Sequence, residues 1–565
     1  MKGYFLFVLA FFVIASSTNI YCSTKVRPSE KSIDADVCIY CATPSGILAA
    51  IAIKAEGYSV VIIEPGKWVG GILGAGVKPI QDCPNFEAVG GRTREYMKVL
   101  GTGKSVQNIS DSVLRKISKT MSPVQVRDDF LKILNQNSIQ VIYEHRIRSC
   151  IKNRGKINET FFDYAPFDET GCPVAKPEKE FNLKVKAKVY IDAGYEGELM
   201  ARSGVSFRTG RESAIDFAES NAGNCEPTNI TPLDPFIEKG NSGSGLLPMV
   251  EDCFNNTIGA GDHYIQAYNF RFYVTTDPKF KIEFKVPKDY DPHNYELVGR
   301  YIENLKKDIA DQDILFQRLS WIFPGWKNAG EYNYQRNSLF TMAPVGVSHL
   351  YANGDYATKA RIWKYHQDYL SGLHYFLSTD TRVPEKFREH TANLGLDIRY
   401  HPETHGWPNQ LYIRESRRLV GRYTISAHDV YNKTQIDDPI ALAQYGIDTY
   451  PSRRIWFKED GKIYVGLEGN MFVGGANGPT NVPYPISYRS ITPKKDECIN
   501  LLVPVCVSAT HLGYASARME PVFMICGESA GIAAIQAIKE NVDVQDIDIK
   551  KYKEKLISLG QKLTW

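Results

Sequence analysis

Three short segments near the start of the chain show an ordered change of hydrophobic pattern. The run DADVCIY from Asp34 is short and apolar, as in a strand buried on both faces of a sheet. GILAAIAIKAEG from Gly46 has the small and apolar residues of a helix packed on a sheet, and YSVVIIE then gives a second strand ending at Glu64. Strand, turn, helix and strand in this order predict a βαβ unit with parallel strands.

The turn between the first strand and the helix, IYCATPSG, lies where a dinucleotide-binding fold has three glycines. Those sites hold Cys41, Thr43 and Gly46, so only the glycine that lets the helix approach the strand is present. Backbone N–H groups at a helix N-terminus bind phosphate whatever the side chains. Glu64 lies 23 positions after Cys41, near the ~20 at which such folds place a ribose-binding acid. We therefore predict a dinucleotide site formed by Cys41, Ala42, Thr43, Pro44, Ser45, Gly46 and Glu64.

The remaining pattern predicts further units along the chain. VQVRDDFLKILNQNSIQVIYEHRI from Val124 reads as a helix and a strand that returns to the first sheet. A β-rich excursion is expected over 150–188. From about 212 to 492 the composition shifts toward Tyr, Trp, Asn and Pro, which indicates an inserted substrate or cap domain of mixed α and β structure. We expect a first domain over 34–211, its second part over 493–545, and a C-terminal helix over 546–565.

Composition and charge limit the classes of function. With 565 residues and 43% hydrophobic content the chain can bury a large core in two or more units. The formal charge is only +3 and no basic stripe is present, so nucleic acid is not an expected partner. Residues 1–23 have one Lys, an apolar stretch and then small polar residues, which predicts a signal peptide and a secreted or periplasmic protein. The apolar stretch is too short for a stable membrane span, and NIY before Cys22 fits a lipid attachment site poorly.

Cysteine and histidine spacing does not predict a metal site. The eleven cysteines are irregularly spaced, and the pair Cys38 and Cys41 has no second pair nearby. The eleven histidines are scattered along the chain, and the Gly-x-Ser-x-Gly pattern around Ser529 belongs to a predicted helix start.

Several segments together resemble a known family. These are ATPSGILAAIAIKAEGYSVVIIEPGKWVGGILGAG, YIDAGYEGELMARSGV from Tyr190, IQAYNFRFYVT, QLYIRESRRLVG, and the long stretch from Tyr484 to Ala537. They look like bacterial FAD-dependent oxidoreductases of the group often found near polysaccharide-degrading genes. The resemblance covers Asp34 to about Asp548. In that group the turn commonly runs Gly-Gly-Thr-Pro-Ala-Gly, so Thr43 conforms, and Cys41 and Ala42 depart.

The resemblance implies a glutathione-reductase-like, Rossmann-type α/β fold of three layers (ββα) that binds FAD. It adds Gly70 and Gly71 of a glycine-dense loop, and Asp192 and Ala193 at a strand end, to the cofactor contacts. Near the C-terminus PVFMICG reads as a strand and ESAGIAAIQAIKE as a helix. In flavoproteins of this type a Gly-acid pair between such elements holds the ribityl chain. Gly527, Glu528 and Ala530 are therefore expected at the cofactor.

Candidate catalytic residues come from the segment that returns to the first domain. His511, expected in a loop, is suited to take a hydroxyl proton as hydride leaves the same carbon. The alternative is a histidine bonded to backbone near the flavin. Arg518 would stabilise negative charge on flavin or substrate, or else form a buried ion pair. Arg414, Arg417 and Arg418 would share one helix face, forming a carboxylate- or sugar-binding wall or a solvated surface, and Asn269 and Arg271 would alternate with aromatic residues along a strand.

The expected function is an exported FAD-dependent oxidoreductase. It would transfer hydride between flavin and a small organic substrate, a sugar or sugar-derived alcohol, and pass electrons to a separate acceptor. A nicotinamide dehydrogenase is a rival, although it has no need of the C-terminal cofactor segment. A second rival is a secreted carbohydrate-binding accessory protein that keeps the fold without turnover, which Cys41 in place of glycine favours.

Overall fold

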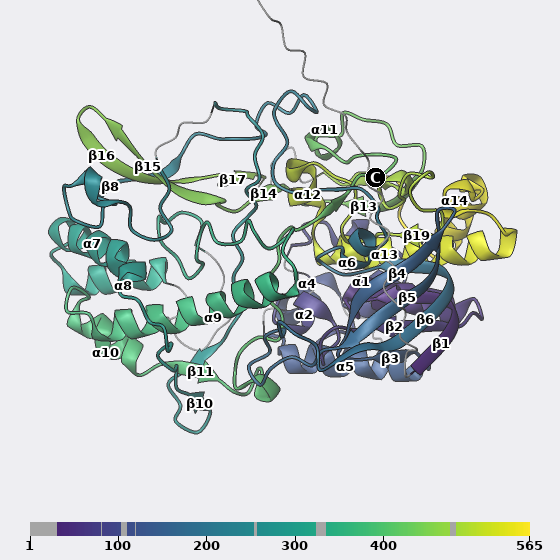
Figure 1. The fold of residues 1–565 in the computed structure, drawn as a ribbon, viewed down its shortest axis with the longest axis horizontal. Helices are drawn as coiled ribbons and strands as arrows, with labels where there is room; N and C mark the ends of the chain where they lie inside the picture. The colour runs from purple at the N-terminus through teal and green to yellow at the C-terminus, as the bar shows by residue number, and fades with distance from the viewer. Residues whose placement is uncertain are drawn as a thin grey trace, which may run out of the picture.

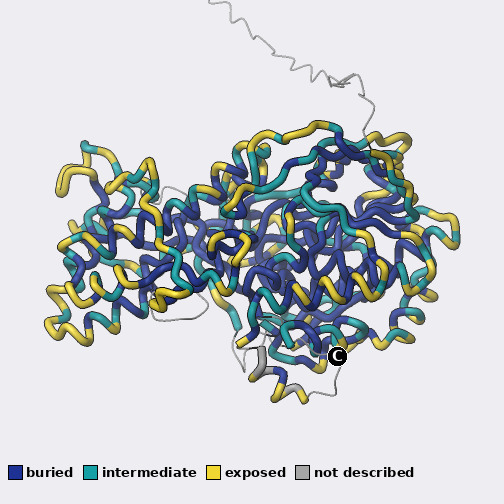
Figure 2. Tube along the Cα trace, turned by 90° about the horizontal axis from the view of Figure 1, so that it is seen from below, coloured by how far each residue is buried: buried dark blue, intermediate teal, exposed yellow. Residues whose placement is uncertain are grey.

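The computed structural model describes residues 31–565 apart from 79, 81, 103–109, 119, 253–256, 324–334 and 475–481. The predicted signal peptide and Cys22 lie outside the described residues. Figure 1 shows a large lobe built on a sheet and a narrower lobe of helices and short strands. Figure 2 shows that buried residues run continuously from one lobe into the other.

The central sheet of the large lobe is parallel. Its strands lie in the order β3 (Gln140–Ile142), β2 (Val60–Ile63), β1 (Lys31–Tyr40) and β6 (Lys179–Asp192), and β19 (Leu501–Leu502) pairs with the end of β6. The segment near the C-terminus thus returns to the sheet that the N-terminal segment begins. Parallel strands all end at one edge, so loops distant in sequence meet there.

The strands bury both of their faces against different layers. Val37 and Ile39 of β1 point into the core shared with the helices, whereas Cys38 and Tyr40 point into a second core. Successive side chains of a strand face opposite sides, so this alternation places one layer on each side of the sheet. The three-layer α/β fold predicted from the sequence is confirmed.

One outer layer is a β-meander. Strands β4 (His145–Asn153) and β5 (Lys156–Tyr164) pair antiparallel with each other, and β5 pairs with the first half of β6. On its other edge β6 pairs with β1 from Leu183 to Asp192, and β19 takes the place of β5 at Tyr190 and Ile191. The β-rich excursion expected over 150–188 corresponds to this meander, which begins five residues earlier at His145.

The helix layer rests on two helices in close contact, α1 (Pro44–Ala55) and α13 (Glu520–Glu540). A Cβ added at Gly531 of α13 would come within 2.6 Å of the carbonyl oxygen of Ala49, and one added at Gly527 would collide with the carbonyl oxygen of Ser45. The two backbones approach this closely because both positions are glycine. Helix α13 is apolar and long enough to cross a membrane, yet 89% of its apolar window is buried, as in a core helix.

The narrow lobe contains four helices and a small sheet. The helices are α7 (His293–Asp308), α8 (Gln312–Ile322), α9 (Tyr356–Thr379) and α10 (Glu385–Ala392). Strands β8 (Thr228–Pro232), β15 (Arg453–Glu459) and β16 (Lys462–Glu468) form an antiparallel sheet. Helix α9 is the long element in Figure 1 whose first turns lie beside the large lobe.

Three local predictions are wrong. PVFMICG is not a strand, because the whole of 520–540 is helix and Gly527 and Glu528 lie in its middle. The segment with Arg414 and Arg417 is not helical, and its arginines are buried instead of forming a solvated face. Asn269 makes only an isolated bridge to Tyr412. In each case burial in the protein interior outweighs the local pattern.

Gly531→Ala tests the contact between the two helices. The added methyl group must displace the backbone of α1 at Ala49, so we expect a loss of about 1–3 kcal/mol in the free energy of unfolding. Urea denaturation measures this loss. Gly243→Ala is the control, because the nearest atom to its added Cβ is a flexible side-chain oxygen at 3.2 Å. Equal stabilities of the two variants would contradict the packing described.

Candidate cofactor and substrate site

A cavity opens at the carboxyl ends of the parallel strands. Cys41 follows β1, Glu64 follows β2, and Gly194 follows β6, and all three line it. Its empty volume, including space open to solvent, is about 940 Å³. We call it the cofactor cavity. Trp68, Arg146, Phe167, Tyr195, Glu198, Tyr351, Lys359, Trp363 and Gln410 are among its other lining residues.

The turn after β1 has the geometry of a glycine turn although it begins with cysteine. Cys41 has φ +77°, in the left-handed region that favours glycine, and its N–H donates to the carbonyl of Ile63 at 2.8 Å. A Cβ at Gly46 would collide with the carbonyl oxygen of Cys41 and lie 3.1 Å from Cβ of Ala193. The sequence therefore keeps glycine at position 46, where a side chain would collide with main chain. It carries backbone strain at Cys41, the site of the first glycine in the usual pattern.

The N-terminus of α1 points its free donors toward the cofactor cavity. Thr43 is the N-cap, and its hydroxyl accepts from the N–H of Gly46 at 3.2 Å and donates to the carbonyl of Ala193 at 2.7 Å. The first N–H groups of a helix have no partner within the helix, and Pro44 has no N–H group. The N–H groups of Thr43 and Ser45 are thus available to a phosphate beside the positive end of the helix dipole.

Glu64 joins the turn to the loop that follows β2. Its carboxylate accepts from the N–H of Ala42 and of Gly66, both at 2.7 Å. Burial raises the pKa of Glu64 to about 7. The carboxylate lines the cofactor cavity, where it can accept hydrogen bonds from ribose hydroxyls.

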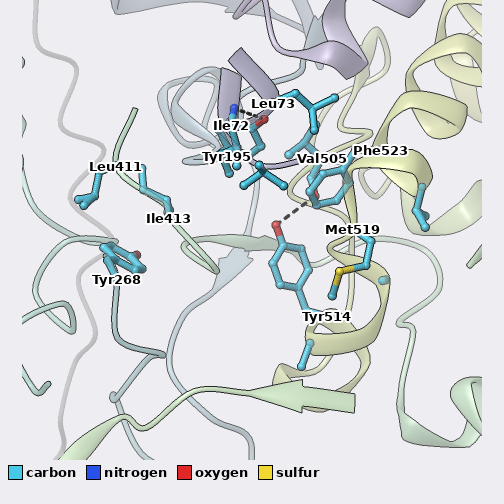
Figure 3. Close-up of a cluster of buried hydrophobic side chains, with 14 of the residues drawn as sticks. Ile72, Leu73, Tyr195, Tyr268, Leu411, Ile413, Val505, Tyr514, Met519 and Phe523 are labelled. Carbon is cyan, nitrogen blue, oxygen red and sulfur yellow. Dashed lines mark hydrogen bonds between the residues drawn. The ribbon is translucent and has the colours of Figure 1, made fainter. Parts of the chain in front are cut away.

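The far end of the cofactor cavity is closed by Tyr195. A Cβ at Gly71 would lie 2.5 Å from the tyrosine oxygen, which accepts from the N–H of Ile72 at 3.1 Å and donates to Glu520 at 2.7 Å. Figure 3 shows the hydrogen bond between Ile72 and Tyr195 within the buried cluster that also contains Met519 and Phe523. Burial raises the pKa of Glu520 to about 8, and its second oxygen has no hydrogen-bond partner among the described residues.

A second cavity lies on the other side of this junction. Its empty volume is about 750 Å³, and Arg518 and Met519, the two residues before Glu520, line it. We call it the arginine cavity. Its other lining residues are Asp82, Arg271, Gln335, Arg336, Asn337, Tyr412, Tyr445, Asp448, Tyr450 and Phe472. Glu520 itself lines neither cavity, but it accepts from Tyr195, which lines the cofactor cavity, and it directly follows Met519, which lines the arginine cavity.

The structure divides the predicted cofactor residues into three groups. Cys41, Thr43, Glu64 and Gly71 line the cofactor cavity. Ala42, Pro44, Ser45, Gly46, Gly70, Asp192 and Ala193 shape the turns beneath it; Asp192, for example, accepts from the N–H of Gly194 and of Met200. Gly527, Glu528 and Ala530 lie apart, within α13.

The expected role of Glu528 is corrected by its contacts. Its carboxylate accepts from Arg92 at 2.9 Å and from the side-chain amide of Gln561 at 2.7 Å. It therefore fastens the start of α3 (Gly91–Met97) and the C-terminal segment at Gln561 to α13. Together with Gly527, whose place is set by the contact with α1, it has a packing role in this geometry.

His511 is not in a loop and lines neither cavity. It is the first residue of α12 (His511–Ala517), and its Nδ1 lies 2.9 Å from Glu415. Its N–H donates to Glu212, and Arg418 bonds the same Glu212. The ring of His511 thus has a carboxylate partner, Glu415, in place of the backbone partner that the alternative expected, and it lies away from both cavities.

Several residues of the site carry no distinctive sequence signal. Gly194 directly follows the predicted strand end, so extending that motif by one residue would have found it. Tyr195 and Glu520 are joined across 325 positions, and only the fold brings them together. Lys359 and Trp363 come from the first turns of α9, which read simply as a helix.

The fold and cavity define a dinucleotide-binding protein of the glutathione-reductase type. The family model described as FAD dependent oxidoreductase matches residues 36–556. The chain therefore belongs to the FAD-dependent oxidoreductase family, and FAD is its cofactor.

Solved structures share parts of this fold. L-proline dehydrogenase from P. horikoshii is 15% identical, with 33% of this chain and 26% of that chain covered and a TM-score of 0.17. A 3-ketosteroid dehydrogenase from Rhodococcus jostii RHA1 is 12% identical, with 32% and 50% covered and a TM-score of 0.18. T. acidophilum thioredoxin reductase is 17% identical, with 28% and 34% covered and a TM-score of 0.15. The chain thus spans about a quarter of the proline dehydrogenase, and a comparison with curated proteins gives no match.

The residues present fit FAD. Helix donors suit a pyrophosphate, and Glu64 suits a ribose. Gly66, Gly71 and Gly194 leave backbone exposed along the cavity wall, where side chains would fill the space. Cys41 is compatible with this arrangement because its backbone already has the conformation of the missing glycine.

Substitution of Cys41 tests whether the turn carries strain. We expect Cys41→Gly to unfold with a free energy about 1–2 kcal/mol higher than Cys41→Ala, since only glycine adopts this φ without cost. The matched control is Ala42→Gly, which should lose stability because Ala42 has no such backbone strain. Urea denaturation gives the free energies, and flavin fluorescence titration gives FAD affinity. A glycine variant no more stable than the alanine variant would show that the turn is unstrained.

Proposed function

We propose that this protein is an exported FAD-dependent oxidoreductase that transfers hydride between the flavin and a small organic substrate, a sugar or sugar-derived alcohol. The observation that carries the proposal is the presence of two separate cavities, one at the ends of the parallel strands and one lined by three arginines, with the Tyr195–Glu520 hydrogen bond near both. One cavity fits the family's cofactor, and the other is polar, separate and large enough for a small substrate.

The chemistry is divided between cofactor and protein. FAD, when bound, supplies a two-electron acceptor for hydride. The hydroxyl proton of an alcohol needs a separate group. Glu520 is suited to hold it, because a carboxyl with a pKa of about 8 exchanges protons near neutral pH. The Tyr195 hydroxyl donates to one oxygen of Glu520, and the other oxygen is buried with no hydrogen-bond partner among the described residues.

Two sequence features support the finer parts of the proposal. The apolar stretch within residues 1–23 supports export. Aromatic rings in both cavities, among them Trp363 in the cofactor cavity and Tyr412 in the arginine cavity, support a sugar because they offer flat apolar faces beside hydrogen-bonding groups. The accessory protein without turnover is the rival function, favoured by Cys41.

The proposal is tested by the visible spectrum of the purified protein and its response to substrates. We expect flavin absorbance near ~450 nm, release of intact FAD on denaturation, and anaerobic bleaching by at least one member of a panel of sugars and sugar alcohols. A panel that leaves the flavin oxidised would favour the accessory role. Failure to take up FAD would contradict the cofactor site itself.

Glu520→Gln tests the proton-holding group. The folded-state pKa of about 8 lies above the ordinary ~4.3, so the native state binds the extra proton between these values. Its contribution to stability is complete below about pH 4.3 and is lost as the pH rises toward 8. The difference in unfolding free energy between wild type and Glu520→Gln should therefore vary by about 1.4 kcal/mol per pH unit in that window. Glu238→Gln on the surface is the control, and a difference independent of pH would refute the assignment.

A further inference from the structure

The arginine cavity has an excess of positive charge within its walls. Arg271, Arg336 and Arg518 line it, against two acids, Asp82 and Asp448. Asp448 is already paired with Arg336. Burying more cations than anions is energetically unfavourable unless a bound anion balances the charge.

A fourth guanidinium adds to this charge from behind the wall. Arg414 is 1% exposed, and its guanidinium lies 3.7 Å from the ring centroid of Tyr450 and 4.5 Å from that of Tyr412. Both tyrosines line the cavity. Burial lowers the pKa of Arg414, and the neighbouring arginines oppose its charge further.

Arg518 lines the arginine cavity and has a hydrogen-bond donor that is not paired with any described residue. It is 6% exposed, and its guanidinium donates to the hydroxyl of Tyr412 at 3.3 Å and to the backbone carbonyl of Asp448 at 2.9 Å. Neither acceptor is a carboxylate, and its Nε has no hydrogen-bond partner among the described residues. A planar guanidinium in this state matches a carboxylate, which accepts two parallel hydrogen bonds.

The position of Arg518 ties the anion to the reaction. It lies two positions before Glu520, whose carboxyl contacts Tyr195 at the wall of the cofactor cavity. A group held by Arg518 would be anchored at one end while its other end approaches the junction. Such anchoring orients the reacting carbon without taking part in the chemistry.

We propose that the arginine cavity binds the carboxylate of a small polyhydroxylated acid, so that the substrate is a sugar acid and not a neutral sugar. The substrate role rests on the oxidoreductase function proposed above. The carboxylate lies on Arg518 and Arg336, and the hydroxylated end of the acid points toward Tyr195. Oxidation of a hydroxyl there would pass a hydride to FAD and a proton to Glu520 in its ionised form, and it would leave a carbonyl group.

Calorimetric titration of the FAD-loaded protein tests the binding site without turnover. The probe is glucuronate, and the matched neutral probe is its methyl ester. We expect the ester to bind at least 10-fold more weakly, and Arg518→Gln and Arg336→Gln each to weaken glucuronate binding about 10–100-fold. Asp448→Asn should strengthen it, because a competing carboxylate is removed. Arg361→Gln, an exposed arginine of α9, should leave it unchanged.

The outcomes separate this inference from the proposed function. Equal affinity for glucuronate and its ester, or no effect of either arginine variant, would overturn the inference even if a neutral sugar bleaches the flavin. Weaker FAD binding by Arg518→Gln, with glucuronate affinity unchanged, would also overturn it, since the arginine would then serve the cofactor. Specific binding of glucuronate without flavin bleaching by any sugar acid would support the carboxylate site and count against the oxidoreductase function.

Discussion

The structure depends on how closely helix α1 lies against its neighbours. Gly46 lets the helix start directly over the end of β1, and Gly531 lets α13 pack against its backbone. No larger residue fits either place without moving main chain. This approach directs the N-terminus of α1 into the cofactor cavity. It also fixes the start of α13, 11 residues before Gly531, beside Tyr195.

Much of the site follows from these two contacts. The donors of α1 come from unsatisfied backbone groups, so they tolerate Cys41 and Thr43 where other sequences have glycine. The start of α13 brings Glu520 into a dry environment that raises its pKa. Arg518 and Met519, immediately before it, then face the second cavity. One packed helix pair thereby positions the N-terminus of α1, Glu520 and Arg518 relative to one another.

Elements that depend on local steric and hydrogen-bonding rules could be predicted from the sequence, and the prediction was accurate near the N-terminus. The βαβ unit, the turn and Glu64 were all found because steric and hydrogen-bonding demands act there over about 30 residues. Near the C-terminus the prediction was wrong, since the apolar run PVFMICG fits a buried helix as well as a strand. His511 was assigned by its type, and its contact with Glu415, 96 positions away, could not be read from the chain. The sequence placed Arg414 on a face with two other arginines and Arg518 in a separate segment, and only folding gathers Arg414 and Arg518 around Tyr412 and Tyr450.

The central claim is that the cavity at the strand ends holds FAD with its pyrophosphate on α1. A crystal structure of the FAD-loaded protein tests this most directly. The account predicts pyrophosphate oxygens about 2.7–3.2 Å from the backbone nitrogens of Thr43 and Ser45, and a ribose on Glu64. Density for FAD elsewhere, or a pyrophosphate that leaves these nitrogens without a contact, would contradict it.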